Sequence, residues 1–256
     1  MDHEGKYIYC IIGTQQDRNF GSIGIGGRGD EVNTIGVDDL AMVISSHPLM
    51  KLVVNRENIL AHEKVIEEVM KEYAVLPVRF CTIASSADEI RSLLFKRYGE
   101  FKNLLRDMDH KVELGVKGLW KDMDSIFKEI AQENKKIGTI KKKLKGDAEQ
   151  GDIQAKIELG KLVEAALKNK KDGEAEKIVD ALKASAFDYK LNNTIGDEMF
   201  INASFLVSKG REKEFDNIME ELSEANKDRI RFMYVGPLPP YNFVNVTIYQ
   251  EEWEKK

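Results

Sequence analysis

Several features that define specialised classes of protein are scarce in this 256-residue sequence. Only two cysteines are present, Cys10 and Cys81, and both lie in apolar runs, so we expect free thiols in a reducing compartment rather than a disulfide. No apolar run approaches the ~18 residues that a membrane span needs. The opening Met1-Asp2-His3-Glu4 lacks a basic region, and the apolar run from Tyr7 to Ile12 is too short for a signal peptide. We therefore expect a cytoplasmic protein that does not enter a membrane.

A basic excess is also missing. The chain has 44 acidic and 39 basic residues and a net charge of −5, which argues against an unspecific nucleic-acid partner. Hydrophobic residues make up 42% of the chain, an ordinary fraction for a folded protein and too high for general disorder. The length corresponds to one or two domains.

What is present is a mixture of strand-like and helix-like patterns. Runs of β-branched and aromatic residues predict strands over 6–13, 32–36, 40–46, 75–84, 111–120, 187–191, 199–207, 230–235 and 243–248. The strand at 111–120 has the cleanest period-two alternation, which is typical of a half-buried antiparallel strand.

Helices are predicted from apolar residues at helical spacing and from capping residues. Asn55 is the expected N-cap of one helix, and Ser86-Ala-Asp-Glu89 is a capping box that opens a second. Residues 122–183 are predicted to be mostly helical, with an interruption near Gly146 to Gly151, and a further helix is expected from Arg211 to Asn226.

These patterns predict an α+β fold with two domains. We place the boundary near Trp120, between an N-terminal α+β sheet domain, residues 1–121, and a C-terminal domain of helices plus a small sheet, residues 122–256. The order strand, strand, helix, strand in the second half suggests a ferredoxin-like, split βαβ arrangement.

The glycine-rich segment Gly21–Gly29 contains a formal match to a phosphate-binding motif, Gly24-Ile-Gly26-Gly-Arg-Gly29. That mechanism needs the glycines between a strand and a helix N-terminus. Here the following residues, 32–36, are strand-like, so a mobile hairpin loop whose glycines gain no side-chain contacts is favoured over a nucleotide site.

Other candidate sites are also weaker than their structural alternatives. His62-Glu63 begins like a zinc motif, but Ile66 stands where the second histidine would be, so His62 is expected to be a hydrogen-bonded core residue. Cys81 has no local histidine signature for a nucleophile. The sequence therefore predicts no catalytic residue, cofactor site or metal site.

Two further motifs could bind partners. The lysine-rich segment 135–145 could touch nucleic acid or an acidic surface, but it lacks interleaved aromatic residues, so a solvated helix face is favoured. Pro237-Leu-Pro-Pro240 could be a ligand for an aromatic groove, but it lies between two strand-like runs and is better interpreted as a stiff chain reversal.

A family resemblance rests on two longer motifs. Val75-Leu-Pro-Val-Arg-Phe-Cys-Thr82 follows His62-Glu63, and Gly236-Pro-Leu-Pro-Pro-Tyr-Asn-Phe-Val244 lies near the end of the chain. Together with the opening Tyr7-Ile-Tyr9 strand and the strand that ends at Trp120, they resemble the gas vesicle protein F/L family over nearly the whole chain. The family usually has glycine at position 81 and serine at position 242, where this chain has cysteine and asparagine.

The resemblance implies a non-enzymatic accessory or minor structural protein that is needed for gas vesicle assembly. Its implied partners are the small apolar shell protein of the vesicle and other gas vesicle accessory proteins, and its implied location is the cytoplasm and the gas vesicle. It also implies a two-domain α+β architecture. The alternatives are a nucleotide- or small-molecule-binding enzyme that uses residues 21–29, and an interaction scaffold unrelated to gas vesicles.

Two hypotheses concern particular sites. Alternation along residues 76–83 places Arg79 among apolar neighbours, so we predict a half-buried ion pair with Glu63, with Glu67 as the alternative partner; a role for Arg79 as a ligand clamp is the competing interpretation. We also place shell-protein binding on residues 1–121, because short strands at a sheet edge can accept an added strand or a helix in an adjoining groove. The C-terminal half and a joint surface are the alternatives.

Overall fold

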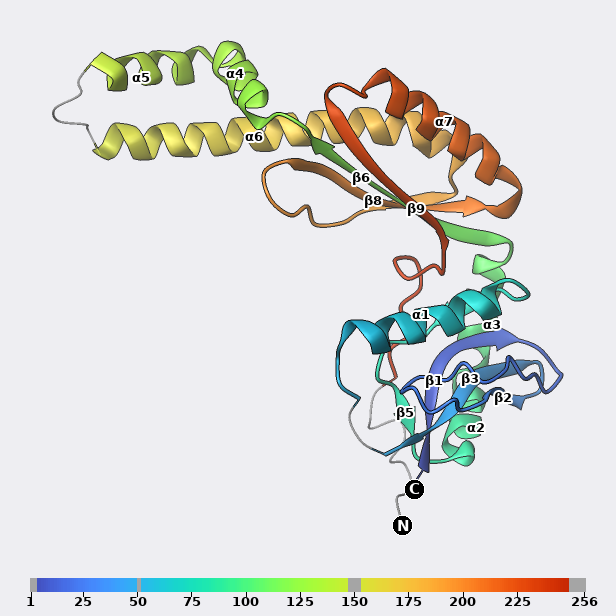
Figure 1. Cartoon of the computed structure of the whole chain (residues 1–256). Helices are drawn as coiled ribbons and strands as arrows, with labels where there is room; N and C mark the ends of the chain where they lie inside the picture. The colour runs from blue at the N-terminus through green and yellow to red at the C-terminus, as the bar shows by residue number, and fades with distance from the viewer. Residues whose placement is uncertain (1–3, 50–51, 147–152, 249–256) are drawn as a thin grey trace. The chain divides into compact units, whose positions relative to one another are not determined.

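The computed structural model describes residues 4–49, 52–146 and 153–248, and these residues form two compact units (Figure 1). Unit 1 is the chain up to Glu113 together with the segment that begins at Pro237, and unit 2 is Leu114–Gly236. Each unit is built around its own antiparallel sheet, so the predicted α+β class is confirmed.

Unit 1 contains five strands and three helices among the described residues. They are β1 (Glu4–Gly13), β2 (Val32–Val37), β3 (Leu40–Pro48), α1 (Arg56–Met70), β4 (Val75–Pro77), β5 (Ile83–Ala84), α2 (Ala87–Lys96) and α3 (Tyr98–Met108). The sheet order is β2-β3-β1-β4, and β5 also pairs with β1. The outer edge of β2 is covered by residues 18–21 of its own chain. The Thr34 N–H donates to the Arg18 carbonyl and the Arg18 N–H to the Thr34 hydroxyl, while the Phe20 N–H donates to the Val32 carbonyl.

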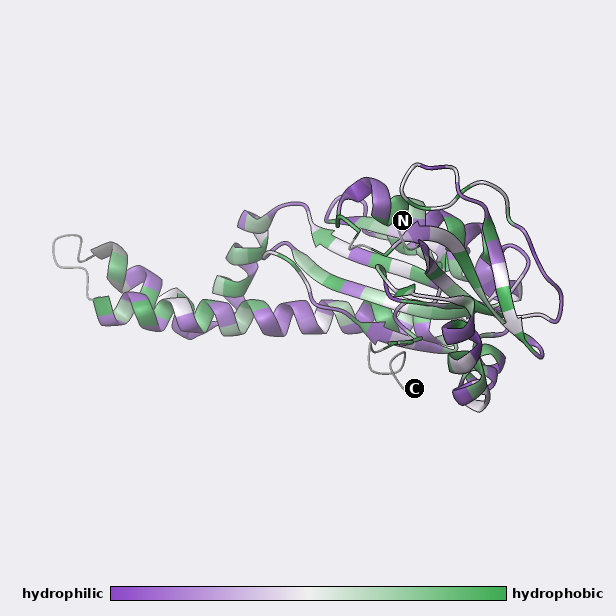
Figure 2. Ribbon diagram, turned by 90° about the horizontal axis from the view of Figure 1, so that it is seen from below, coloured by the Kyte–Doolittle hydropathy of each residue, from purple (hydrophilic) through white to green (hydrophobic). Residues whose placement is uncertain are grey.

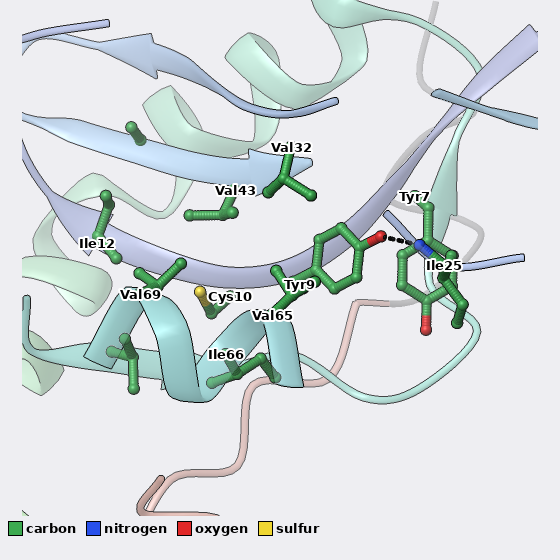
Figure 3. Close-up of a cluster of buried hydrophobic side chains, with 12 residues drawn as sticks. Tyr7, Tyr9, Cys10, Ile12, Ile25, Val32, Val43, Val65, Ile66 and Val69 are labelled. Atoms are coloured by element: carbon green, nitrogen blue, oxygen red, sulfur yellow. Dashed lines mark hydrogen bonds between the residues drawn. The ribbon is translucent and has the colours of Figure 1, made fainter. Parts of the chain in front are cut away.

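The core of unit 1 lies between the sheet and α1 (Figure 3). The register between β1 and β3 shifts between Ile8 and Cys10, and this irregularity lets Tyr7, Tyr9 and Cys10 join the same cluster. From α1, Val65, Ile66 and Val69 pack against them, which is the helical spacing that the sequence predicts. The helices α2 and α3 also contact the sheet, through β2, β3, β1 and β4.

The predicted helix caps of unit 1 are confirmed. The Asn55 side chain accepts a hydrogen bond from the Asn58 backbone at 2.8 Å. Ser86 accepts one from the Glu89 backbone, while the Glu89 carboxylate turns back to the backbone N–H of Ser85 at 2.7 Å. Such a cap satisfies backbone donors that have no partner inside the helix.

Unit 2 has the element order β-α-β-β-α-β. Three consecutive helices, and not one, connect its first strand to its second. Its elements are β6 (Lys111–Trp120), α4 (Met123–Glu133), α5 (Lys135–Gly146), α6 (Ile153–Leu182), β7 (Asp188–Leu191), β8 (Met199–Ser208), α7 (Glu212–Ala225) and β9 (Ile230–Leu238). The sheet order is β7-β8-β6-β9. The strand at 111–120 is confirmed, and it is an inner strand whose predicted exposed face is itself partly buried. The side chains of Glu113 and Leu119, on its predicted exposed face, are only 2% and 6% exposed.

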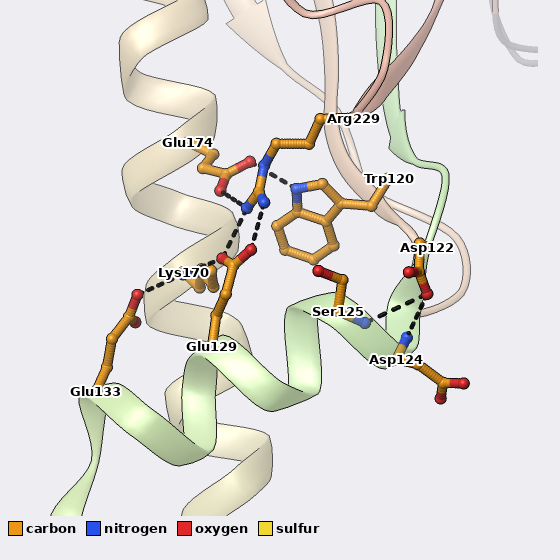
Figure 4. Close-up of polar contacts among 9 residues, drawn as sticks. All are labelled: Trp120, Asp122, Asp124, Ser125, Glu129, Glu133, Lys170, Glu174 and Arg229. Atoms are coloured by element: carbon orange, nitrogen blue, oxygen red, sulfur yellow. Dashed lines mark hydrogen bonds and ion pairs between the residues drawn. The ribbon is translucent and has the colours of Figure 1, made fainter.

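A charged network joins α4 and α6 to one end of the unit 2 sheet, where β6 ends and β9 begins (Figure 4). Arg229 donates two hydrogen bonds to Glu129 and one to Glu174, and the Trp120 indole N–H donates to Glu174 at 2.5 Å. Lys170 lies 3.0 Å from Glu129. The paired geometry of Arg229 and Glu129 is the arrangement in which an arginine–carboxylate contact is strongest.

The helices α5 and α6 form an arm that extends away from the sheet of unit 2 (Figure 2). The helix α6 has 30 residues, and α5 packs against it and against α4. The C-terminal part of α6 contacts β8 and α7 (Figure 1). The predicted interruption near Gly146 to Gly151 falls almost entirely on residues 147–152, which lie outside the described residues.

One prediction about the chain's layout is corrected. Residues 243–248 do not form a strand of the second sheet; they belong to unit 1, where Val246 makes a single parallel bridge with Val78. The division by contacts also differs from a cut after residue 121, because β6 belongs to the second sheet whereas residues 237–248 return to unit 1. Local sequence patterns could not reveal this return, since it depends on contacts more than a hundred residues apart.

The network of Figure 4 makes stability depend on pH. The hydrogen bond from Arg229, followed by those from Lys170, lowers the pKa of Glu129 from 4.5 to about 2. A lowered folded-state pKa stabilises the protein above the unfolded pKa, and this contribution is lost as the pH falls from about 4.5 towards 2. We expect Glu129→Gln to lower the free energy of unfolding at pH 7 and to flatten its decline over this range, measured by denaturant unfolding at several pH values.

The matched control is Glu158→Gln, which changes an exposed glutamate of α6. This variant should follow the wild-type pH curve. A Glu129→Gln curve parallel to the wild type between pH 5 and 2 would contradict the assignment.

Candidate functional site

A pocket of about 400 Å³ lies in unit 1. One wall is α1, which contributes Ile59, His62 and Glu63. The second wall is residues 77–80, at and beyond the end of β4, and the third is the C-terminal segment, through Tyr241 and residues 244–247. The pocket therefore joins the two longest motifs of the sequence, residues 75–82 and 236–244, which are far apart in the chain.

The C-terminal wall is held by buried hydrogen bonds. Glu113, which is 2% exposed, accepts two bonds from Asn242, one from its backbone N–H at 2.8 Å and one from its side-chain amide at 2.5 Å. Arg97 donates to the Thr247 carbonyl at 2.9 Å. Sequence analysis missed Glu113, although a lone glutamate between the apolar residues Val112 and Leu114 of a strand was a usable signal.

His62 lies at the inner side of the pocket and is 3% exposed. Its Nδ1 is 2.9 Å from the Tyr7 hydroxyl, and its ring stacks on Tyr9, so the predicted hydrogen-bonded core histidine is confirmed. The Tyr7 hydroxyl also accepts the backbone N–H of Cys81 at 3.2 Å. The hydroxyl proton of Tyr7 is then donated to Nδ1, since the Cys81 N–H is only a donor.

This arrangement leaves a proton on Nε2 of His62. Burial lowers the pKa of His62 to about 4, with a smaller raising effect from the Val78 backbone, so the ring is neutral at pH 7. Nε2 is buried, and the Val78 backbone is too poorly placed to give it a hydrogen bond of normal geometry within the described residues. A buried N–H without a well-placed acceptor is costly, so an acceptor brought into the pocket by a ligand would relieve that cost.

Glu63 and Arg79 line the same pocket but do not form the predicted ion pair. Arg79 is exposed, and within the described parts of the chain no carboxylate lies within ion-pair distance of it. The physical reason is that β4 ends at Pro77, so the assumed alternation does not continue through residue 79. Burial, followed by repulsion from Glu67, raises the pKa of Glu63. Burial also raises the pKa of Tyr241.

Cys81 turns the chain beneath the pocket with a positive φ of 67°. This left-handed conformation favours glycine, which is the usual residue of the resembled family at this position. Cys10 is fully buried and Cys81 is partly buried, and both are free thiols. Burial raises the pKa of each thiol.

The glycine-rich segment is a loop, as predicted, and it is anchored to the core at Ile25. Ile25 is fully buried and donates its backbone N–H to the Tyr9 hydroxyl at 2.8 Å, as Figure 3 shows. A Cβ on Gly24 would lie 2.6 Å from the Asp30 carbonyl oxygen, so the chain passes too closely for any side chain there. The segment leads into β2 and not into a helix, so it has no helix N-terminus to face a phosphate.

Exposed apolar side chains lie near the pocket on α1 and just before it. Ile59, at the pocket wall, is 37% exposed, and Leu60 beside it is 51% exposed. Val53 and Val54, which precede the helix cap, are 69% and 72% exposed. Such a group of exposed apolar residues beside a pocket is typical of a surface that binds another protein.

Two features are absent from the described ranges. No helix there is both long and apolar enough to cross a membrane. No three histidine, cysteine or acidic side chains gather there in a way that could hold a metal ion.

The fold and the pocket define a class: a two-unit α+β protein whose candidate site is a partly apolar binding pocket. The chain belongs to the family described as gas vesicle synthesis protein GvpL/GvpF, which matches residues 5–245. This confirms the resemblance that the two sequence motifs indicated.

Named relatives agree with this assignment. The chain is 31% identical to gas vesicle protein F of a Streptomyces strain over 221 residues, covering 86% of this chain and 91% of that one. It is 27% identical to gas vesicle protein F1 of Halobacterium salinarum over 252 residues, covering 97% of both chains. The fold matches the crystal structure of GvpF from Anabaena with a TM-score of 0.81 and 22% identity, over 95% of this chain and 99% of that one.

The backbone strain at Cys81 gives a first test of the site. Cys81→Gly should keep or raise stability by up to about 1 kcal/mol, because glycine adopts a positive φ without a steric penalty. Cys81→Val should lower it by about 1–3 kcal/mol, because a β-branched residue is strained there. Denaturant unfolding measures both, and equal losses in the two variants would contradict the backbone argument.

The anchor at Glu113 gives a second test. Glu113→Gln places an amide N–H₂ against one of the two N–H donors of Asn242. It should therefore lower the free energy of unfolding by about 1–3 kcal/mol. It should also speed amide hydrogen exchange in residues 241–247. Asn242→Ser keeps the backbone N–H and adds a hydroxyl donor, so its cost should be below about 1 kcal/mol. Unchanged exchange in Glu113→Gln would show that the segment does not depend on this contact.

Proposed function

We propose that the chain takes part in gas vesicle assembly by binding the small apolar shell protein through unit 1. The family description and the names of the relatives support the assembly role. The observation that carries the binding proposal is the pocket beside α1, with a poorly satisfied N–H on His62 and exposed apolar residues next to it. We further propose that the protein acts without catalysis, in the cytoplasm and at the gas vesicle, and that other accessory proteins are additional partners.

The geometry favours a helix or an apolar side chain over an added strand. Addition of a strand needs an edge whose backbone groups are unpaired. Residues 18–20 already pair with β2, and Val246 bridges to Val78 beyond β4. The pocket instead offers an apolar wall at Ile59 and Val244 and a buried donor at His62, which suits an apolar anchor that carries a hydrogen-bond acceptor.

We also propose a more specific fold for unit 2. A β-α-β-β-α-β chain order together with the sheet order β7-β8-β6-β9 supports a ferredoxin-like, split βαβ arrangement. The division at residues 1–121 and 122–256 stays a prediction. Fragments cut there would separate residues 237–248 from the pocket, so binding experiments should use the full chain.

The test is capture of co-expressed shell protein by the tagged full-length chain. We expect Ile59→Glu/Leu60→Glu to reduce the captured shell protein at least tenfold, because two charges would be buried against an apolar partner without compensation. Phe95→Glu is the matched control, since Phe95 is a 73% exposed apolar residue of α2 that does not line the pocket. Near-wild-type circular dichroism and unfolding would show that each variant is folded.

An exposed apolar surface of unit 2 is the alternative binding site for the shell protein. In unit 2, Phe187 and Ile195 flank β7 and are 73% and 76% exposed. If Phe187→Glu/Ile195→Glu abolishes capture while the α1 variant keeps it, binding lies on the C-terminal half and the proposal is wrong. Loss in both variants would indicate a joint surface.

A further inference from the structure

The charges of unit 2 are separated along the chain. Helix α5 contains six lysines and no acidic residue, in a chain whose net charge is −5. Counting the three acidic residues of 147–152, the stretch 135–152 still carries a net +3. Helix α7 has the opposite character, with six acidic residues and one lysine among its 14 residues.

The lysines of α5 are available for a partner. Lys135, Lys136, Lys141 and Lys142 are exposed, and none forms an ion pair with another residue that the structure describes. Lysines elsewhere in unit 2, such as Lys170 and Lys183, do pair with carboxylates of their own chain.

The acidic helix offers a matching surface. A hollow at α7 is lined by Glu220, Glu221 and Glu224, together with small and amide side chains and one cation, Lys227. Glu224 pairs with Lys227, whereas Glu220 and Glu221 are exposed and have no ion pair within the described ranges. With about 1.5 Å per residue, α5 and α7 are about 18 and 21 Å long, so their charged faces are similar in length.

The two helices cannot neutralise one another within one molecule. They lie near opposite ends of the 30-residue helix α6, whose length is about 45 Å at 1.5 Å per residue (Figure 1). The helix α5 packs against α4 and α6, while α7 packs against the other part of α6. A contact between α5 and α7 therefore requires a second copy of the chain.

We propose that the face made by Lys135, Lys136, Lys141 and Lys142 on α5 binds the hollow around Glu220 and Glu221 on α7 of a second copy. If two α6 helices run side by side in opposite directions, each α5 meets the partner's α7, and the same contact forms twice about a two-fold axis. Such a contact closes on itself and gives a dimer rather than a filament. Single exposed ion pairs contribute little, so the interaction depends on many charges together and weakens with salt.

Charge reversal in the full-length chain tests this proposal by sedimentation velocity over a range of protein concentrations. The wild type should dimerise at about 0.05 M salt, where the screening length exceeds 10 Å, and dissociate at about 0.5 M salt. Lys141→Glu/Lys142→Glu and Glu220→Lys/Glu221→Lys should each weaken dimerisation at low salt at least tenfold. An equimolar mixture of these two variants should form a mixed dimer, because each α5 then meets an α7 of opposite charge.

The matched control is Lys64→Glu/Lys96→Glu, which makes the same charge change at exposed lysines of unit 1 and should dimerise like the wild type. Several outcomes would overturn the proposal: a wild type that stays monomeric at low salt, a dimer that is indifferent to both reversals, or two weakened variants that do not restore each other. A monomer that instead binds a single-stranded oligonucleotide through Lys141 and Lys142 would assign the arm to a nucleic-acid partner and would equally overturn it.

Discussion

The hydrogen bonds between Glu113 and Asn242 are the constraint on which the candidate site depends. The chain leaves unit 1 after Glu113, forms the whole of unit 2, and returns at Pro237. The returning segment has little regular structure of its own, so specific contacts must fix it. A buried carboxylate with two donors from one residue supplies such a contact, because an unpaired carboxylate in that place would be far more costly. The third wall of the pocket exists only because this return is fixed.

The polar groups under the pocket form one connected arrangement. The Cys81 backbone donates to Tyr7, Tyr7 donates to His62, and the remaining proton of His62 lies at the inner side of the pocket. The positive φ of Cys81 positions the backbone N–H that donates to the Tyr7 hydroxyl. Through Tyr7, this backbone conformation bears on which ring nitrogen of His62 carries the proton. The same core cluster holds Ile25 of the glycine-rich segment, so that segment serves to close the core rather than to bind a phosphate.

Unit 2 uses charge in two different ways. Near the sheet, Arg229, Glu129, Glu174 and Lys170 are paired and partly buried, and they fix α4 and α6 to the strands. Along α5, Lys135, Lys136, Lys141 and Lys142 are exposed and form no ion pair with another residue that the structure describes. Charges that pair within the chain stabilise the fold. A cluster of exposed charges of one sign instead attracts or repels approaching molecules.

The sequence by itself determined the local structure and the family. Period-two and helical patterns placed β1, β2, β3, β6 and β8 and most helices, and caps such as Asn55 and Ser86 marked where helices begin, because these features depend on neighbours a few residues away. Motifs around Cys81 and Asn242 indicated the family. Only the tertiary structure decided that residues 237–248 return to unit 1, that Arg79 lacks the expected partner and that Ile25 is buried. Those outcomes depend on which distant segments meet, and a local pattern carries no information about a hydrogen bond formed across the 129 residues that separate Glu113 from Asn242.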